Sequence, residues 1–235
     1  MPIYDLNTLQ GITHKLSPSS ERDILGIPFI EIQEFPFDKI NSEYTLIKYN
    51  NCNAKTALAE FKIGHGFMSD PWLWSYSKKP ISFLKKVGRL AAWATPDFSI
   101  DMDASPAQAI GIVEQSRFIG RLGQEMGQTV FATVGWSRPE LDYICFAGLR
   151  DGAIFFISTL GVKNEKCIPN FIRGYKVMRT LYPHSKIVCV GSKIEGMDDD
   201  VIHIDYEESF GYKPYQQLKL FTCISERKEN KIYGK

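Results

Sequence analysis

Short apolar runs that alternate with longer amphipathic segments constrain the fold of this chain more than any other feature. Runs such as AIFFIS and KIVCV are β-branched or aromatic throughout, which is typical of strands covered on both faces of a parallel sheet. The expected strands are Pro28–Ile32, Thr45–Tyr49, Leu90–Ala94, Thr129–Val134, Ala153–Ser158, Lys186–Val190 and Val201–Asp205. Their alternation with helices predicts βαβ units and an α/β fold with a mostly parallel sheet. A partial or irregular (β/α) barrel and an open doubly wound sheet both fit this order.

The segments between the expected strands carry helix start and stop signals. Ser105 and Gln108 form a capping box at the start of one helix, and Gly127 supplies its stop. Further helices are expected over residues 80–88 and 169–182, each of which begins with a proline. Five apolar side chains of the first helix share one face and are expected to point into the core: Ile112, Phe118, Ile119, Leu122 and Met126.

The composition limits the classes of protein to which this chain can belong. The 235 residues are 44% hydrophobic, which suits one α/β domain over residues 1–235 with a polar segment 1–25 and an exposed charged tail 225–235. Lys and Arg total 28 against 27 for Asp and Glu, and this balance argues against a broad phosphate-binding face. Because the chain has neither a bilayer-spanning apolar run nor a signal-peptide core, we expect a cytoplasmic protein, in the host cytoplasm if phage-encoded, with no membrane partner.

The five cysteines and four histidines show no zinc-ligand spacing. There is no C-x-x-C pair, and an odd number of cysteines fits reduced thiols in a cytosol. Cys145 and Cys189 lie in apolar runs, where a thiol usually serves as a small core residue. A structural zinc is therefore not expected. His65 stands between two glycines in an expected loop, and is interpreted either as a proton-transferring histidine or as an ordinary loop residue.

Polar residues follow several of the expected strands. Ligands of parallel α/β folds bind at the carboxyl ends of the strands, so these residues should meet at one edge of the sheet. Asp97 follows the third expected strand, Trp136 and Arg138 follow the fourth, and Ser158 and Thr159 stand at the end of the fifth. This is the content of an active site or a polar binding cleft, and also of ordinary solvated loops.

Asp97 is the candidate catalytic residue. Pro96 pushes Thr95 toward an extended conformation, which presents Asp97 at the rim of the sheet. The carboxylate can act as a general acid or base, or can hold Mg²⁺ together with Asp101 or Asp103. The alternative is that Asp97 caps a turn through its own backbone. No specific metal-binding motif accompanies it, so the cofactor is unknown and Mg²⁺ is a candidate only.

Two arginine-containing groups are candidate binding residues. Arg117, Arg121 and Gln124 fall on one side of the same helix, where the arginines can grip a phosphate or carboxylate, or can form a solvent-facing polar side. Arg138, beside Trp136, can bind an anion or stack on a base, or can lie in an exposed turn. The sequence contains no Walker loop, no G-x-G-x-x-G and no G-x-S-x-G elbow.

Several of these motifs together resemble a known family. In chain order they are Thr95-Pro96-Asp97-Phe98-Ser99, Ser116-Arg117 with Gly120 and Gln124, Gly127 before the strand into Trp136, Cys145-Phe146-Ala147-Gly148, Ile157-Ser158-Thr159-Leu160-Gly161 and Val190-Gly191. On these residues the chain resembles the domain-of-unknown-function family numbered 4417, from about residue 65 to residue 195. Members of that family occur largely in phages, integrative elements and bacterial genomes that carry them. The resemblance therefore implies a mobile-element setting, and it implies no established reaction.

Three hypotheses from different classes follow. The first is an enzyme acting on a nucleic acid or nucleotide, with Asp97 as acid/base or metal ligand and Arg117 or Arg138 holding phosphate. The second is a non-enzymatic accessory protein that sequesters a host protein or a small signal molecule, for which the aromatic side chains of Trp72–Tyr76 would form an exposed interface. A third is a structural role in a virion or element complex.

Overall fold

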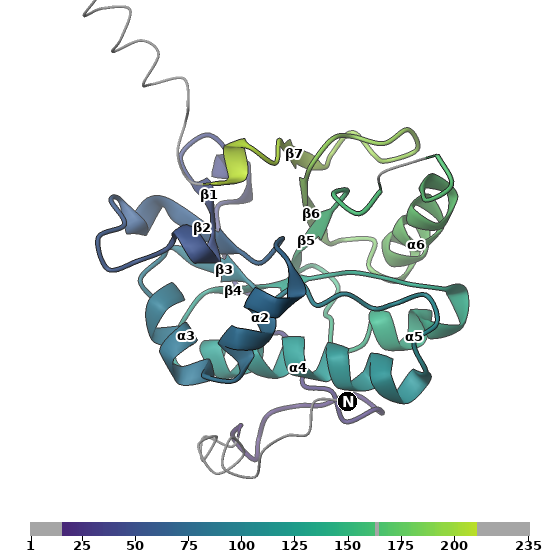
Figure 1. The fold of residues 1–235 in the computed structure, drawn as a ribbon, viewed down its shortest axis with the longest axis horizontal. Helices are drawn as coiled ribbons and strands as arrows, with labels where there is room; N and C mark the ends of the chain where they lie inside the picture. The colour runs from purple at the N-terminus through teal and green to yellow at the C-terminus, as the bar shows by residue number, and fades with distance from the viewer. Residues whose placement is uncertain (1–15, 163–164, 211–235) are drawn as a thin grey trace, which may run out of the picture.

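Seven strands form one all-parallel sheet in the order β1 to β7, as seen in a computed structural model that describes residues 16–162 and 165–210 (Figure 1). The strands are β1 (Thr45–Lys48), β2 (Lys62–His65), β3 (Ala92–Ala94), β4 (Val130–Thr133), β5 (Ile154–Ser158), β6 (Lys186–Val190) and β7 (Ile202–Ile204). The sheet curls into a half-barrel with helices interspersed between the strands. The tail 225–235 and the first fifteen residues lie outside the described part of the chain.

The strand order confirms the α/β prediction and decides between its two forms. In a doubly wound sheet the strand order reverses at a switch point, whereas here every strand pairs with the strand that precedes it along the chain. The architecture is that of an incomplete (β/α) barrel. The carboxyl ends of all seven strands consequently share one rim.

Helices connect most of the strands. They are α2 (Asp70–Ser77), α3 (Pro80–Val87), α4 (Pro106–Glu125), α5 (Asp142–Cys145) and α6 (Ile168–Leu181), with short 3-10 turns η1 (Phe37–Lys39), η2 (Tyr49–Asn51), η3 (Ala59–Phe61), η4 (Pro139–Leu141) and η5 (Glu208–Phe210). The predicted capping box opens α4, because the side chains of Ser105 and Gln108 each bond the other's backbone N–H. Gly127 follows α4 with a φ of 77°, a conformation that glycine adopts at little cost.

The two faces of the sheet pack differently. Alternate strand residues such as Trp93 and Phe155 face outward and pack in clusters that include side chains of α3, α4 and α6. The intervening residues, among them Phe131 and Phe156, fill the concave side, where the segment before β1 contributes Phe37 to the same cluster. The half-barrel is therefore a packed core at its centre, and space for a ligand is left only toward its rim.

The open side of the half-barrel is bridged near the rim by side chains rather than by an eighth strand. The Lys48 ammonium of β1 lies 2.8 Å from the Tyr206 hydroxyl, and 4.6 and 4.3 Å from the ring centres of Tyr206 and Phe210. Asn51 donates to the Phe210 carbonyl at 2.7 Å. These contacts hold η5 and the residues after β7 against β1, so the two edges of the sheet are connected.

The expected strand over residues 28–32 is wrong. The Ile30 N–H donates to the Gly148 carbonyl at 3.0 Å, and the Glu31 N–H donates to the Gln124 side chain at 3.0 Å. A loop and a side chain thus take the place of a neighbouring strand, and the apolar pattern of this segment reflects contact with the core rather than strand pairing.

A strand that was not predicted, β2, pairs with both β1 and β3. Its sequence KIGH contains Gly64, which lowers strand propensity. The glycine leaves room for its neighbours, because a Cβ there would lie 2.7 Å from Cδ1 of Leu90 and 3.2 Å from Cβ of Trp93. His65 ends this strand instead of lying in a loop, and its ring is fully buried with Nε2 at 2.8 Å from the Ser209 carbonyl.

The apolar face predicted for α4 is right only in part. Ile119 and Leu122 are buried, whereas Met126 is 46% exposed. A Cβ at Gly120 would overlap Thr95 and one at Gly123 would overlap Trp93, so these glycines let the helix approach the sheet closely. Backbone proximity therefore decides which side of α4 faces inward. No helix in the described part of the chain combines the length and apolar character that a membrane crossing requires.

Candidate active site

A cavity of about 690 Å³ opens at the rim of the half-barrel, among residues that follow β2, β3, β4, β5 and β7 and those that begin α6. Its aromatic lining consists of Phe67, Phe98, Trp136, Phe171 and Tyr206. Its polar lining includes Asp97, Ser69, Ser99, Ser158, Lys166 and Asn170. The volume lies within the range of small-molecule sites, and the position is where parallel barrels bind their ligands.

Asp97 is held at the rim by hydrogen bonds to the two residues that precede it. The Thr133 N–H donates to the Thr95 hydroxyl at 2.9 Å, and the Thr133 hydroxyl donates to the Thr95 carbonyl at 2.5 Å. The Ser116 hydroxyl donates to the Pro96 carbonyl at 2.8 Å. Because β4 and α4 both fix the two residues before it, the Asp97 carboxyl has a defined position at the cavity wall.

The Asp97 carboxyl is the strongest candidate for a reactive group in the site. It is partly buried, and within the described residues it has no hydrogen-bond partner. Burial, the largest cause, and the neighbouring carboxylate of Asp70 together raise its pKa from 3.8 to about 7, against the opposing charge of Arg117. A carboxyl that exchanges its proton near neutral pH and faces a cavity is equipped for acid–base chemistry.

Arg117 lies behind Asp97 and away from the main cavity. It is 2% exposed, and its Nε and Nη1 donate to the carbonyls of Ala147 and Thr133 at 3.2 and 2.8 Å. Burial lowers its pKa to about 10, which leaves the guanidinium charged at neutral pH. It shares with Asp97 a second cavity of only about 20 Å³. Its role in binding phosphate stays a prediction. Its contacts tie α4 to the end of β4 and to the loop after α5, and its charge lowers the pKa of Asp97.

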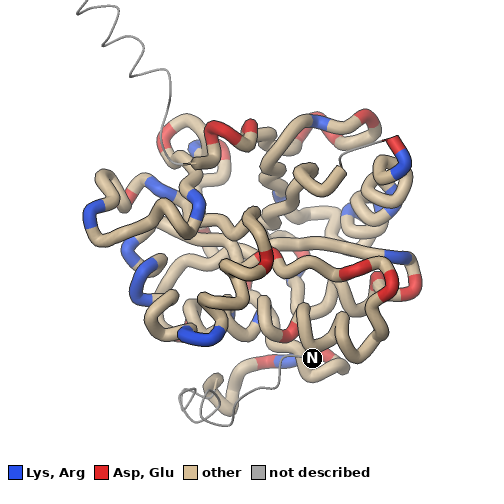
Figure 2. The backbone as a smooth tube through the Cα atoms, viewed as in Figure 1, with Lys and Arg blue, Asp and Glu red and all other residues tan. Residues whose placement is uncertain are grey.

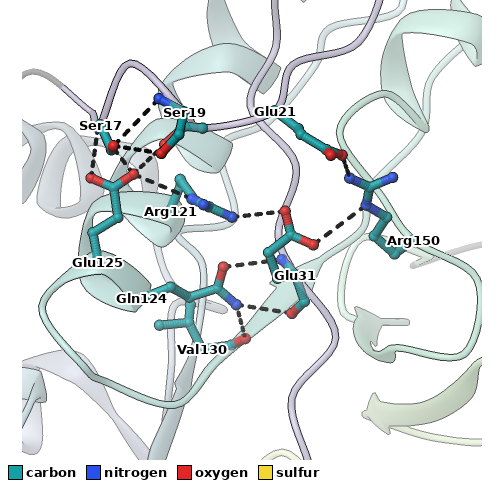
Figure 3. Close-up of polar contacts among 10 residues, drawn as sticks. Ser17, Ser19, Glu21, Glu31, Arg121, Gln124, Glu125, Val130 and Arg150 are labelled. Carbon is teal, nitrogen blue, oxygen red and sulfur yellow. Dashed lines mark hydrogen bonds and ion pairs between the residues drawn. The ribbon is translucent and has the colours of Figure 1, made fainter.

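Arg121 and Gln124 are not close to the cavity but bind Glu31, in the part of the chain before β1 that we call the N-terminal segment (Figure 3). Arg121 forms ion pairs with Glu31 at 2.8 Å and Glu125 at 3.4 Å. The Gln124 amide accepts from the Glu31 N–H and donates to the Glu31 carbonyl at 2.9 Å, in the manner of a neighbouring strand. Both side chains hold residues before β1 against α4, and no donor of theirs is directed at the cavity.

The remaining predicted residues divide between the cavity wall and its surroundings. Trp136 lines the cavity and packs on Phe171 with ring centres 5.1 Å apart. Ser158 lines it as well, and its hydroxyl donates to the Val190 carbonyl at 3.0 Å. Thr159 is buried and donates to the Ser192 carbonyl at 3.0 Å, and Arg138 donates to the Met102 carbonyl at 2.6 Å outside the wall. Asp97, Trp136 and Ser158 are thus the predicted residues that the fold brings together.

In the residues that the structure describes, no group of three His, Cys, Asp or Glu side chains is close enough to hold a metal ion. Asp101 and Asp103 are exposed, and only Asp97 of the three lines the cavity. The aromatic segment Trp72–Tyr76 does not form an exposed cluster either. Trp72 is 58% exposed, whereas Trp74 stacks on Phe98 with ring centres 4.3 Å apart.

Sequence reasoning missed the contribution of α6 and of the residues after β2 and β7. Lys166, Cys167 and Asn170 at the start of α6 line the cavity, and no side chain caps this helix end. The signal was present, because a helix beginning with Ile168-Pro169 after a strand directs its N-terminus toward the ligand-binding rim. Phe67 and Tyr206 were missed because β2 was not recognised and the residues after β7 were not considered.

The fold and the site define a partial (β/α) barrel with a polar, aromatic-lined cavity at the carboxyl ends of its strands. The chain belongs to the family described as Domain of unknown function (DUF4417), whose model matches residues 24–207. This finding confirms the family resemblance that the motifs carry.

Two phage proteins are similar to this chain over 102 residues each, or 43% of its length. The Gene 1 protein of Mycobacterium phage D29 is 33% identical, with 38% of that protein covered, and the Gene 1 protein of Mycobacterium phage L5 is 30% identical, with 44% covered. The match thus spans about two fifths of these relatives. No solved structure matches the chain. The comparisons associate the protein with phages and give it no reaction.

Proposed function

We propose that this protein is an enzyme that acts on a nucleotide-sized ligand in the rim cavity, with Asp97 as its general acid or base. The observation that carries the proposal is a carboxyl that faces the cavity, has no hydrogen-bond partner among the described residues and has a pKa raised to about 7. A group of this kind holds and releases a proton at neutral pH, which is the requirement for acid–base catalysis.

The lining of the cavity supports a planar ligand. Phe67, Phe98, Trp136, Phe171 and Tyr206 provide aromatic surface around a space of about 690 Å³. Stacking on aromatic side chains is sequence-tolerant and is the usual way in which proteins hold nucleobases. A base placed against this lining would bring its polar edge, or the bond to its sugar, toward Asp97.

The helix α6 at one end of the cavity supports an anionic group on the same ligand. The N-terminal end of α6, a helix of 14 residues, contributes Cys167 and Asn170 to the lining, and Lys166 precedes it. Free N–H groups and the dipole at a helix N-terminus favour phosphate. In this proposal α6 takes the phosphate-holding role that the sequence suggested for Arg117 and Arg138.

Arg117 has a separate part in the proposal as a positioning residue. Its buried charge lowers the pKa of Asp97 and so opposes the effect of burial. Without this charge the pKa of the carboxyl would be higher still. With it, both protonation states are populated near pH 7.

The experiment is a turnover assay with the 5′-monophosphates of the common ribonucleosides and 2′-deoxyribonucleosides. Release of base and of phosphate is followed by liquid chromatography. We expect one class of substrate to be consumed, and Asp97→Asn to lower kcat by about 10²-fold or more. Asp101→Asn, which alters an exposed acid on the same loop, serves as the matched control and should keep the wild-type rate. The proposal fails if no nucleotide is consumed, or if Asp97→Asn retains full activity.

The same cavity also supports the second candidate function, sequestration of a small signal molecule. Its aromatic lining binds a planar ligand whether or not chemistry follows. Calorimetric titration with the same nucleotides separates the two functions. Binding that is unaffected by long incubation, with no product, favours sequestration over catalysis.

A further inference from the structure

The near-zero net charge of the chain conceals a strong separation of charge along it. Between residues 53 and 93 there are seven Lys or Arg residues and two Asp or Glu residues, whereas residues 194–210 contain seven acids and no Lys or Arg. In Figure 2 the blue segments gather on the left side of the molecule, around α3 and the loop before β2, and red segments prevail at the top and right. One face is therefore distinctly basic.

Six side chains make up what we call the α3 basic surface. They come from the loop before η3, the turn between α2 and α3, the last turn of α3 and the second residue after that helix: Lys55, Lys78, Lys79, Lys85, Lys86 and Arg89. Five of them are exposed, and Lys86 is half-buried against the Tyr76 ring with its ammonium 4.9 Å from the ring centre. None of the six lines the rim cavity.

These cations have no acidic partner among the described residues, whereas several other basic side chains of the molecule do. Arg121, Arg150, Arg173, Arg179 and Lys193 each form an ion pair with a nearby carboxylate. Within the described residues no ion pair involves any member of the α3 basic surface. Like charges at this density repel one another. Lys86 and Arg89 also contribute to the fold, through the Tyr76 ring and a hydrogen bond to the Asn53 carbonyl at 3.1 Å.

The surface is suited to an anionic partner that does not need an apolar anchor on the helix. The apolar side of α3, formed by Phe83, Leu84 and Val87, is fully used in the core, so it is not free to enter a lipid bilayer. Trp72, which is 58% exposed on α2, adds an aromatic face on the helix that leads to Lys78. Exposed lysines, with an exposed aromatic ring on the preceding helix, are a combination by which proteins bind nucleic-acid strands.

We propose that the α3 basic surface binds the phosphate backbone of a nucleic acid, separately from the ligand in the rim cavity. The interaction is electrostatic and independent of base sequence, with the lysines placed against successive phosphates. This inference goes beyond the proposed acid–base function and does not depend on it, because the two sites share no residue.

The test is fluorescence anisotropy with a fluorescein-labelled 25-nucleotide DNA, single-stranded and as a duplex, titrated at several NaCl concentrations. The variant Lys78→Gln/Lys79→Gln/Lys85→Gln removes three exposed cations of the surface, and none of the three has an ion pair to lose. If all three contact phosphates, the slope of log K against log salt should become shallower by about 2.7 for the duplex and about 2.1 for the single strand. The affinity at 0.1 M salt should fall at least tenfold.

The matched control, Lys39→Gln/Lys176→Gln/Lys193→Gln, removes the same charge from other elements and should change the affinity less than threefold. Asp97→Asn should bind DNA as the wild type does, which separates this test from that of the proposed function. The inference is overturned if neither DNA binds at 50 mM salt, or if the control loses as much affinity as the variant. It is equally overturned if vesicles containing phosphatidylserine bind and DNA does not.

Discussion

Replacing Asp97 by Asn should stabilise the protein, and by an amount that grows with pH. The folded state holds the Asp97 proton up to a pKa of about 7, whereas the unfolded chain releases it near 3.8. Between these values the folded protein binds more protons than the unfolded one, so this carboxyl lowers the free energy of unfolding as pH rises. Asn imitates the protonated carboxyl and has no charge to bury at any pH.

The size of the effect follows from the two pKa values. Their difference, at 1.36 kcal/mol per pH unit, sets an upper limit of about 4 kcal/mol at pH 8. Asp97 lines an open cavity and is only partly buried, so solvent screening reduces the expected gain to about 2 kcal/mol. For a chain of 235 residues that corresponds to about 4–8 °C in Tm. At pH 4 the difference between variant and wild type should be small.

The assay is calorimetric or fluorescence-monitored unfolding of both proteins from pH 4 to 8.5. Comparing the two at each pH cancels the contributions of all other titrating groups, including the buried His65. Asp101→Asn controls for the loss of a charge on the same loop, and its Tm difference from wild type should be small throughout. An Asp97→Asn difference that does not change with pH would refute the reasoning, because it would mean that the carboxyl ionises alike in both states.

Three further predictions concern the framework of the site. Gln124→Ala removes two hydrogen bonds to the backbone of the N-terminal segment, and should therefore lower the free energy of unfolding by about 1–3 kcal/mol. Urea titrations measure this loss, and an unchanged free energy would contradict the anchoring role of Gln124. Burial lowers the pKa of His65 to about 4, so the stability that neutral His65 gives the folded protein is lost as pH falls from 6.5 to 4. The Tm difference between His65→Gln and wild type should therefore become smaller over that range. Gly174→Ala places a Cβ on the Trp136 ring and should lower Tm and alter tryptophan fluorescence. Gly111→Ala is its control, because a Cβ there meets nothing within 4 Å and should stabilise the protein by about 0.4–1 kcal/mol.

Much of the fold could be read from the sequence because most of its strands are continuous apolar runs. AIFFIS and KIVCV became β5 and β6, which are almost entirely buried. The strand β2 escaped prediction because it has a glycine in its middle, where Leu90, Trp93 and Tyr49 pack closely. Local propensity and tertiary packing conflict at this residue, and packing prevails.

The candidate site could be predicted where one residue follows one strand. Asp97 was found in this way, since the rule that ligands bind at strand carboxyl ends needs only the strand itself. The inward position of Arg117 could not be found, because it follows from how closely Gly120 and Gly123 let α4 approach the sheet. A helical wheel records side-chain polarity and contains no information about the depth of the backbone.

The sequential order of the strands bears on how the molecule is made. Each new strand pairs with the strand synthesised just before it, so no strand has to wait for the end of the chain to find its first partner. The loops closed at each step are only tens of residues long, which limits the entropy lost before contacts form. The sheet can thus grow from β1 toward β7 as the chain leaves the ribosome, and the contact of Lys48 with Tyr206 and Phe210 is then among the last to form.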